Sequence, residues 1–223
     1  MTREFSAMRM IPLLFTVLFL LAPPAWADKH KPPPNPQDAQ DVFRVEKYLN
    51  ARRDISAQFI QTTDSGQTVT GTVLIKRPGK MNLAYDPPMK DFIIADGSFV
   101  YLWDGELEHS TTIPIGDSLA DLILRNNVRL SGDVQVERIE RGAAKLEITV
   151  RQASDPGNGA MTLLFEDYPL ILHGWRVEDA QGRSTTIALQ DMRENIDLPA
   201  RKFIFVPPKL GTSAKHDKPI NQK

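Results

Sequence analysis

From residue 52 onward the sequence breaks into a long succession of short strand-like segments, and each segment ends at a turn signal. Dipeptides such as Pro78-Gly79, Asp96-Gly97 and Asp104-Gly105 favour tight reversals between antiparallel strands. The segments that we expect as strands are residues 55–63, 69–77, 81–85, 92–95, 98–103, 106–113, 133–140, 145–151, 161–166, 170–178, 184–195 and 203–206. About eleven consecutive strands with short connections predict one antiparallel sheet that is strongly curved or closed.

Two segments show a helical pattern instead. Apolar positions recur at helical spacing within residues 37–51, flanked by charged residues, which predicts an amphipathic helix that begins near Asn35 or Asp38. Ser118 is expected to cap a second, short apolar helix over residues 119–124. No repeat of 20–50 residues is present, so propellers and solenoids are not expected.

The N-terminus has the pattern of a secretory signal peptide. Arg3 and Arg9 precede an apolar run over residues 11–22, and Ala25-Trp26-Ala27 supplies a small-x-small cleavage site. The alternative, a membrane anchor, is less favoured because a spanning helix needs about 20 apolar residues. The expected organisation is a signal peptide over residues 1–27, a Pro-rich linker over 28–36, one β-rich domain over 37–208 and a polar tail over 209–223.

The absence of cysteine excludes several kinds of chemistry at once. It excludes disulfides, thiol nucleophiles, Cys-ligated zinc and iron–sulfur clusters, and also the lipid-modified cysteine of an anchored bacterial lipoprotein. An exported protein without cysteine fits the bacterial periplasm. A net charge of −1 argues against a nucleic-acid partner, because neutralising phosphates needs a basic surplus.

No catalytic motif stands out in the sequence. There is no GxSxG, HExxH, Walker or GxGxxG pattern, and the four histidines are not at metal-ligand spacing. We therefore expect no enzyme, no metal site and no cofactor. A glycosidase-type carboxylate pair stays open, because such pairs meet only in the fold.

One strand segment is apolar on both of its faces. Over residues 98–103, Phe99, Tyr101 and Trp103 alternate with Val100 and Leu102. A sheet that is covered on one side only would alternate apolar with polar residues. Something must therefore cover the second face of part of this sheet, and only two short helices are available. They either pack tightly on the concave side or cover an incompletely filled apolar cavity.

Arg77 shares a strand face with Val73 and Ile75, so its guanidinium is expected to point where apolar side chains point. A buried guanidinium needs partners, and its rigid fork of donors suits backbone carbonyls at the end of a covering helix or loop. The functional hypothesis is a latch that holds a lid over a cavity. The alternative is a strand-end arginine that bends into solvent.

Five segments in order resemble one known family, over about residues 42–208. These are AQFIQ at 57–61, GTVLIKRPGKM at 71–81, ADG at 95–97, YLWD at 101–104 and FIFVPP at 203–208. Together they resemble the periplasmic outer-membrane lipoprotein carrier family (LolA-type). The resemblance implies an unclosed antiparallel β-barrel of about eleven strands, with short helices that cover a hydrophobic cavity.

The function implied by the resemblance is a monomeric periplasmic carrier. Such a carrier accepts acylated lipoproteins from an ATP-driven inner-membrane release complex, shields their acyl chains and delivers them to an outer-membrane acceptor. In the family the arginine of the Arg-Pro motif holds the lid, and the residues after it line the cavity. The expected cavity residues are Val73, Ile75, Met81, Leu83, Ile93, Phe99, Tyr101 and Trp103, and Arg77 is the expected latch. The alternative function is a periplasmic binding module for another lipid or hydrophobic ligand.

Overall fold

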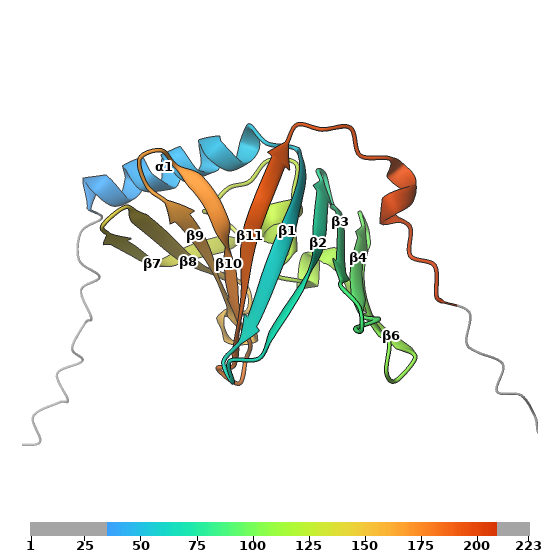
Figure 1. Ribbon diagram of the computed structural model, residues 1–223. Helices are drawn as coiled ribbons and strands as arrows, with labels where there is room; N and C mark the ends of the chain where they lie inside the picture. The colour runs from blue at the N-terminus through green and yellow to red at the C-terminus, as the bar shows by residue number, and fades with distance from the viewer. Residues whose placement is uncertain (1–34, 209–223) are drawn as a thin grey trace, which may run out of the picture. The chain divides into compact units, whose positions relative to one another are not determined.

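The computed structural model describes residues 35–208, in which eleven strands form a single antiparallel sheet (Figure 1). The order across the sheet is β6-β5-β4-β3-β2-β1-β11-β10-β9-β8-β7. The strands are β1 (Asp54–Thr63), β2 (Thr68–Lys76), β3 (Lys80–Tyr85), β4 (Phe92–Asp96), β5 (Phe99–Asp104), β6 (His109–Pro114), β7 (Val134–Gly142), β8 (Lys145–Gln152), β9 (Ala160–Glu166), β10 (Ile171–Glu178) and β11 (Ser184–Glu194). Strands β6 and β7 are the two ends of this order, so the expected unclosed sheet of about eleven strands is confirmed.

Strands β1 and β11 join the two halves of the sheet. Strands β1 to β6 follow one another as neighbours on one side, and β7 to β11 do so on the other. The two series meet where β1 pairs antiparallel with β11, in a register that places Phe59 opposite Leu189. These are also the longest strands, with 10 and 11 residues, and they lie at the centre of the sheet (Figure 1).

Helix α1 (Pro36–Asn50) is the amphipathic helix that the sequence predicts. The Asn35 side chain accepts a hydrogen bond from the backbone N–H of Gln37 at 3.0 Å, so Asn35 is the N-cap. Pro36 occupies the first turn of the helix, where a backbone N–H would have no intrahelical acceptor, so the N–H that proline lacks is not missed. Of the two expected starts, Asn35 is therefore confirmed.

Helix α2 (Asp121–Leu124) is shorter than the expected helix over residues 119–124. The Ser118 hydroxyl accepts a hydrogen bond from the backbone N–H of Ala120 at 3.0 Å, so it stabilises the turn that enters the helix. A short 3₁₀ helix, η1 (Ile115–Asp117), precedes this turn. All three apolar residues of α2 are buried, so this short helix is held by its packing.

The apolar core lies between the two helices and one face of the sheet, which we call the inner face. Both halves of the sheet contribute, since Leu83 of β3 and Ile148 of β8 belong to one cluster although they are far apart in the strand order. The sheet must therefore curve around the helices. The helical members of the core include Val45, Tyr48, Leu49, Leu122, Ile123 and Leu124.

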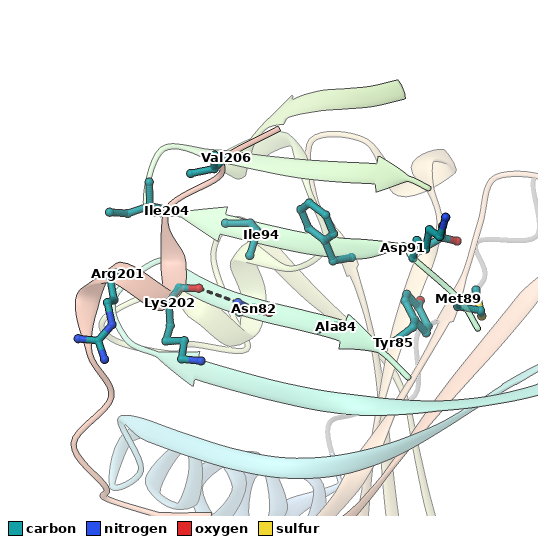
Figure 2. A pocket seen from close by; sticks show the side chains of 12 residues that line it. Asn82, Ala84, Tyr85, Met89, Asp91, Ile94, Arg201, Lys202, Ile204 and Val206 are labelled. Atoms are coloured by element: carbon teal, nitrogen blue, oxygen red, sulfur yellow. Dashed lines mark hydrogen bonds between the residues drawn. The ribbon is translucent and has the colours of Figure 1, made fainter. Parts of the chain in front are cut away.

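The expected strand over residues 203–206 is wrong. The chain forms a 3₁₀ helix there, η3 (Ala200–Phe203), and then runs extended without joining the sheet. The reason is that β3, β4 and β5 already have neighbours on both sides, so no ladder position is free. Residues 198–208, the C-terminal segment, instead cross the opposite face of these strands, which we call the outer face (Figure 2).

The expected signal peptide, most of the expected linker and the expected tail lie outside the described residues. Within residues 35–208, no helix is both long enough and apolar enough to cross a membrane.

Candidate functional site

Arg77 follows β2 and is buried, with 7% of its surface exposed. Its Nε donates a hydrogen bond to the carbonyl of Ile123 in α2 at 2.6 Å. Its Nη1 donates to the carbonyl of Leu49 near the end of α1 and to the carbonyl of Arg52 at 3.1 Å. The alternative of an arginine that bends into solvent is therefore wrong, and one guanidinium connects the ends of both helices to the sheet.

The guanidinium of Arg77 stays charged at neutral pH despite its burial. Burial, with a smaller contribution from the positive charge of Arg53, lowers the pKa of Arg77 from its ordinary value to about 10. The accepting carbonyls of Leu49 and Ile123 carry the negative partial charge of helix C-termini, which compensates the buried charge. These are charge-assisted hydrogen bonds, the stronger kind.

The turn after Arg77 supports the same contact through its backbone. The N–H of Arg77 donates to the carbonyl of Arg53 at 2.9 Å, and the N–H of Gly79 donates to the carbonyl of Leu124 at 2.7 Å. Gly79 has φ +75°, and a Cβ at this position would lie 2.8 Å from Cα of Gly97. The Arg-Pro-Gly turn therefore binds α2 by side chain and by main chain.

Helix α1 is also joined to the half of the sheet formed by β7 to β11. Asp41 is buried and accepts hydrogen bonds from Arg44 at 2.8 Å and from Arg141 of β7 at 2.7 Å. The Tyr48 hydroxyl accepts from the backbone N–H of Leu172 in β10 at 3.0 Å. These contacts come from two strands, β7 and β10, and they fix the position of α1 on the sheet.

The connection from α2 to β7 is hydrogen-bonded to α1. The Asn50 side chain donates to the carbonyl of Val128 at 3.0 Å and accepts from its N–H at 2.8 Å. The Glu46 carboxylate accepts from the backbone N–H of Leu130 at 2.7 Å. Helix α2 is thus held by this connection, by the Arg77 turn and by its apolar packing.

Five of the expected cavity residues lie together on the inner face beside the helices. Val73, Ile75, Met81 and Leu83 are buried, and Ile93 is partly buried next to them. They share the apolar cluster with the side chains of α2. Their burial means that the helices pack closely on this surface in the structure, as in the first of the two sequence alternatives.

The other three expected cavity residues, Phe99, Tyr101 and Trp103, lie on the outer face, so the prediction of one shared surface is wrong for them. Trp103 stands opposite Phe92 in the pairing of β4 with β5, and the two rings stack with centroids 6.0 Å apart. Phe205 of the C-terminal segment stacks on Tyr101, with ring centroids 4.5 Å apart and an interplanar angle of 1°. The C-terminal segment therefore covers the second apolar face of this strand, which the helices were expected to cover.

Strand alternation places Val100 and Leu102 on the inner face, where sequence reasoning did not assign a role to them. The missing signal was the pair of aromatic residues Phe203 and Phe205 in the C-terminal segment. They supply a second cover that was available in the sequence but was interpreted as a strand.

The C-terminal segment is also hydrogen-bonded to the strands that it crosses. Asn82 of β3 donates from Nδ2 to the carbonyl of Lys202 at 2.6 Å (Figure 2). Lys76 donates from Nζ to the carbonyl of Leu198 at 2.6 Å. An open groove of about 400 Å³ runs beside it over β3 and β4. Lys76 and Asn82 alternate along their strands with inner-face residues, so the same two strands contact the helices on one side and this segment on the other.

Comparison with known proteins matches residues 51–206 to the family model described as outer membrane lipoprotein carrier protein LolA. The chain belongs to this family. A LolA-family relative from Pseudomonas syringae pv. syringae (strain B728a), named outer-membrane lipoprotein carrier protein, is 28% identical over 182 residues, which cover 77% of this chain and 86% of the relative. A relative of the same name from Pseudomonas fluorescens (strain Pf0-1) is 27% identical over 212 residues, which cover 91% of this chain and 97% of the relative.

Among solved structures, a LolA superfamily protein from Nitrosomonas europaea aligns with 12% identity and a TM-score of 0.44, over 74% of this chain and 97% of that chain. The LolA-family match covers β1 to β11 and most of the C-terminal segment, including the Arg77 turn.

Proposed function

We propose that this LolA-family protein is a periplasmic carrier that binds the acyl chains of lipoproteins at its inner face and delivers the lipoproteins to the outer membrane. Arg77 carries the proposal, because it joins both covering helices to the sheet above a buried aliphatic surface. The relatives' name, outer-membrane lipoprotein carrier protein, supports outer-membrane lipoproteins as the cargo.

The inner face suits acyl chains because it is aliphatic and adaptable. Removing one acyl methylene from water stabilises a complex by about 0.8 kcal/mol, so a carrier needs a continuous apolar surface. The side chains of Met81 and Leu83 have no strong hydrogen-bonding groups, and a methionine side chain adopts many conformations easily. In the closed structure Leu122, Ile123 and Leu124 occupy this surface, and acyl chains would replace their contacts with similar ones. Such an exchange is reversible, as delivery requires.

Helix α2 is the element whose displacement would open the inner face. Hydrogen bonds to β7 and β10 hold α1 on the sheet, whereas α2 depends on the Arg77 turn, on its three apolar side chains and on the connection that follows it. Hydrogen bonds of about 1 kcal/mol net each can be broken when cargo enters. Loading also needs energy to extract a lipoprotein from a membrane, and we assign that task to an ATP-driven release complex in the inner membrane. An outer-membrane acceptor would then receive the cargo.

A release assay tests this function. The protein comprising residues 28–223 is incubated with ATP and inner-membrane vesicles that carry the cognate release complex. The soluble fraction is then examined for lipoprotein that co-elutes with the protein. We expect a stoichiometric soluble complex that depends on ATP. If an active complex released nothing to the folded protein while a fluorescent fatty acid still bound, the protein would bind another lipid instead.

A further inference from the structure

Beneath α2 lies a small enclosed cavity of about 10 Å³, about the space of one water-sized sphere. It is lined by apolar side chains of the core cluster, among them Leu122, Val134, Val150 and Met161, together with the arginine that ends α2, Arg125. The cavity therefore belongs to the same apolar cluster as the inner-face surface proposed to bind acyl chains. Polar and charged residues also line it, namely Ser118, Asp121, Arg125, Arg151 and Gln152.

Arg125 has one donor that nothing satisfies. Its Nη1 donates to Asp133 at 3.0 Å, and its Nη2 pairs with Asp121 of α2. Its Nε is buried and is the only buried side-chain nitrogen or oxygen within residues 35–208 that lacks a hydrogen-bond partner. A buried N–H without an acceptor costs free energy, so a ligand that supplies an acceptor gains by binding there.

The other polar groups around the cavity are already engaged. The Gln152 side chain donates to the carbonyl of Gly116 at 3.1 Å, and the Ser118 hydroxyl accepts from Ala120. Arg151 pairs with Glu137 at 2.6 Å. Among these groups, the Nε of Arg125 is the one buried donor without a hydrogen-bond partner.

The chemistry of this donor favours a neutral acceptor. The two carboxylates of Asp121 and Asp133 compensate the charge of Arg125, so a further anion would gain little from it. A carbonyl oxygen accepts an N–H without adding charge. In an acylated lipid the ester carbonyl stands where the apolar chain meets the polar head, which matches one donor at the border of an apolar surface.

We infer that the cavity beneath α2 is the subsite for an acyl ester carbonyl, with Arg125 Nε as its hydrogen-bond donor. The inference rests on the proposed function. Arg125 ends α2, and Arg77 binds the carbonyl of Ile123 in the same helix. Displacement of α2 would therefore enlarge this cavity together with the rest of the inner face.

The test measures affinity for two synthetic lipopeptides with the same peptide and chain lengths. One carries a diacylglyceryl-cysteine with two ester carbonyls, and the other carries the matching ether-linked chains. Both are measured with the unmodified protein and with Arg125→Lys, which keeps the positive charge but lacks Nε. Arg125→Met is a second variant without any donor, and Arg129→Lys on the exposed connection is the matched control.

For each protein, the affinity for the ester-linked lipopeptide is divided by the affinity for the ether-linked one. The decisive quantity is this ratio for the unmodified protein divided by the same ratio for the variant. We expect a value of about three to ten for both Arg125 variants, the effect of one hydrogen bond, and about one for Arg129→Lys. A value of one for the Arg125 variants, with good binding of both lipopeptides, would overturn the subsite and leave the carrier function intact. Binding of neither lipopeptide to the unmodified protein would refute the function and the subsite together.

Discussion

Replacing Arg77 with leucine tests whether Arg77 holds α2 in its closed position or instead supports the whole fold. The change removes three hydrogen bonds to the carbonyls of Leu49, Arg52 and Ile123. At about 1.5 kcal/mol each for a charged donor, this loss is about 4–5 kcal/mol. The leucine also abolishes the cost of burying the charge. Lowering the pKa of Arg77 from its ordinary value to about 10 corresponds to about 3 kcal/mol of that cost.

The balance is a net loss of about 1–2 kcal/mol. We expect it to loosen α2 most, because α1 keeps its hydrogen bonds to β7 and β10. Hydrogen exchange measures it locally. We expect exchange at the backbone amides of residues 122–125 to rise about 5- to 30-fold, the change that this free energy produces. The amides of β1 and β11 at the centre of the sheet should change much less.

The exposed arginine Arg138, replaced by leucine, serves as the control, because it makes only one surface ion pair at 3.6 Å. Cargo should still enter Arg77→Leu, but its retention and release should change. If exchange rose equally in α2 and in β1, and the midpoint of thermal unfolding fell by the equivalent of several kcal/mol, Arg77 would be a general support of the fold. Unchanged exchange in α2 would also contradict a latch.

Three further predictions concern the inner face, the C-terminal segment and an ion pair. Leu83→Glu should weaken lipopeptide affinity at least tenfold, because a carboxylate would stand among acyl chains; affinity is measured by displacement of a fluorescent fatty acid. Phe205→Ala should lower the free energy of unfolding by about 2–3 kcal/mol, since its ring loses the stacking on Tyr101; urea denaturation measures this. The hydrogen bond from Arg125 lowers the pKa of Asp133 below 3.8. The stability that this ion pair contributes is therefore present above about pH 5, and it is lost as the pH falls through the pKa of Asp133 in the folded protein. Asp133→Asn should therefore reduce the loss of thermal stability between pH 5 and pH 2, as followed by circular dichroism.

Each of these predictions has an outcome that would contradict it. Equal affinities for Leu83→Glu and for the outer-face change Asn82→Glu would mean that the inner face does not hold the ligand. An unchanged urea midpoint for Phe205→Ala would show that the C-terminal segment contributes nothing to the outer face. Identical acid profiles for Asp133→Asn and the unmodified protein would remove the ion pair from the pH dependence.

Local signals predicted most of the elements correctly. Turn dipeptides between strand-like segments placed β1 to β11 within a few residues of their observed bounds, and the pattern around Asn35 predicted the start of α1. Residues 203–206 were the exception, because an apolar alternation identifies strand-like chain but not whether a neighbouring strand is free to pair with it. Here the nearest strands already had both neighbours.

At the candidate site, local sequence patterns also predicted some features correctly and others not. Sharing a face with Val73 and Ile75 was enough to predict that Arg77 is buried and needs acceptors. Alternation along residues 98–103 was also recognised, but the choice of inner or outer face for Tyr101 and Trp103 was wrong. Period-two alternation divides a strand into two sets and carries no information on which set faces the helices.

The sequence by itself determined the strand succession, the two helices, the resemblance to the LolA family and the need for partners at Arg77, because these depend on residue types within a few positions. Only the tertiary structure decided which carbonyls Arg77 binds, that the C-terminal segment covers the outer face, and that the Nε of Arg125 lies buried without an acceptor. Each of these joins parts of the chain that are distant in sequence. Their proximity results from the curvature of the whole sheet around α1 and α2, which no local pattern specifies.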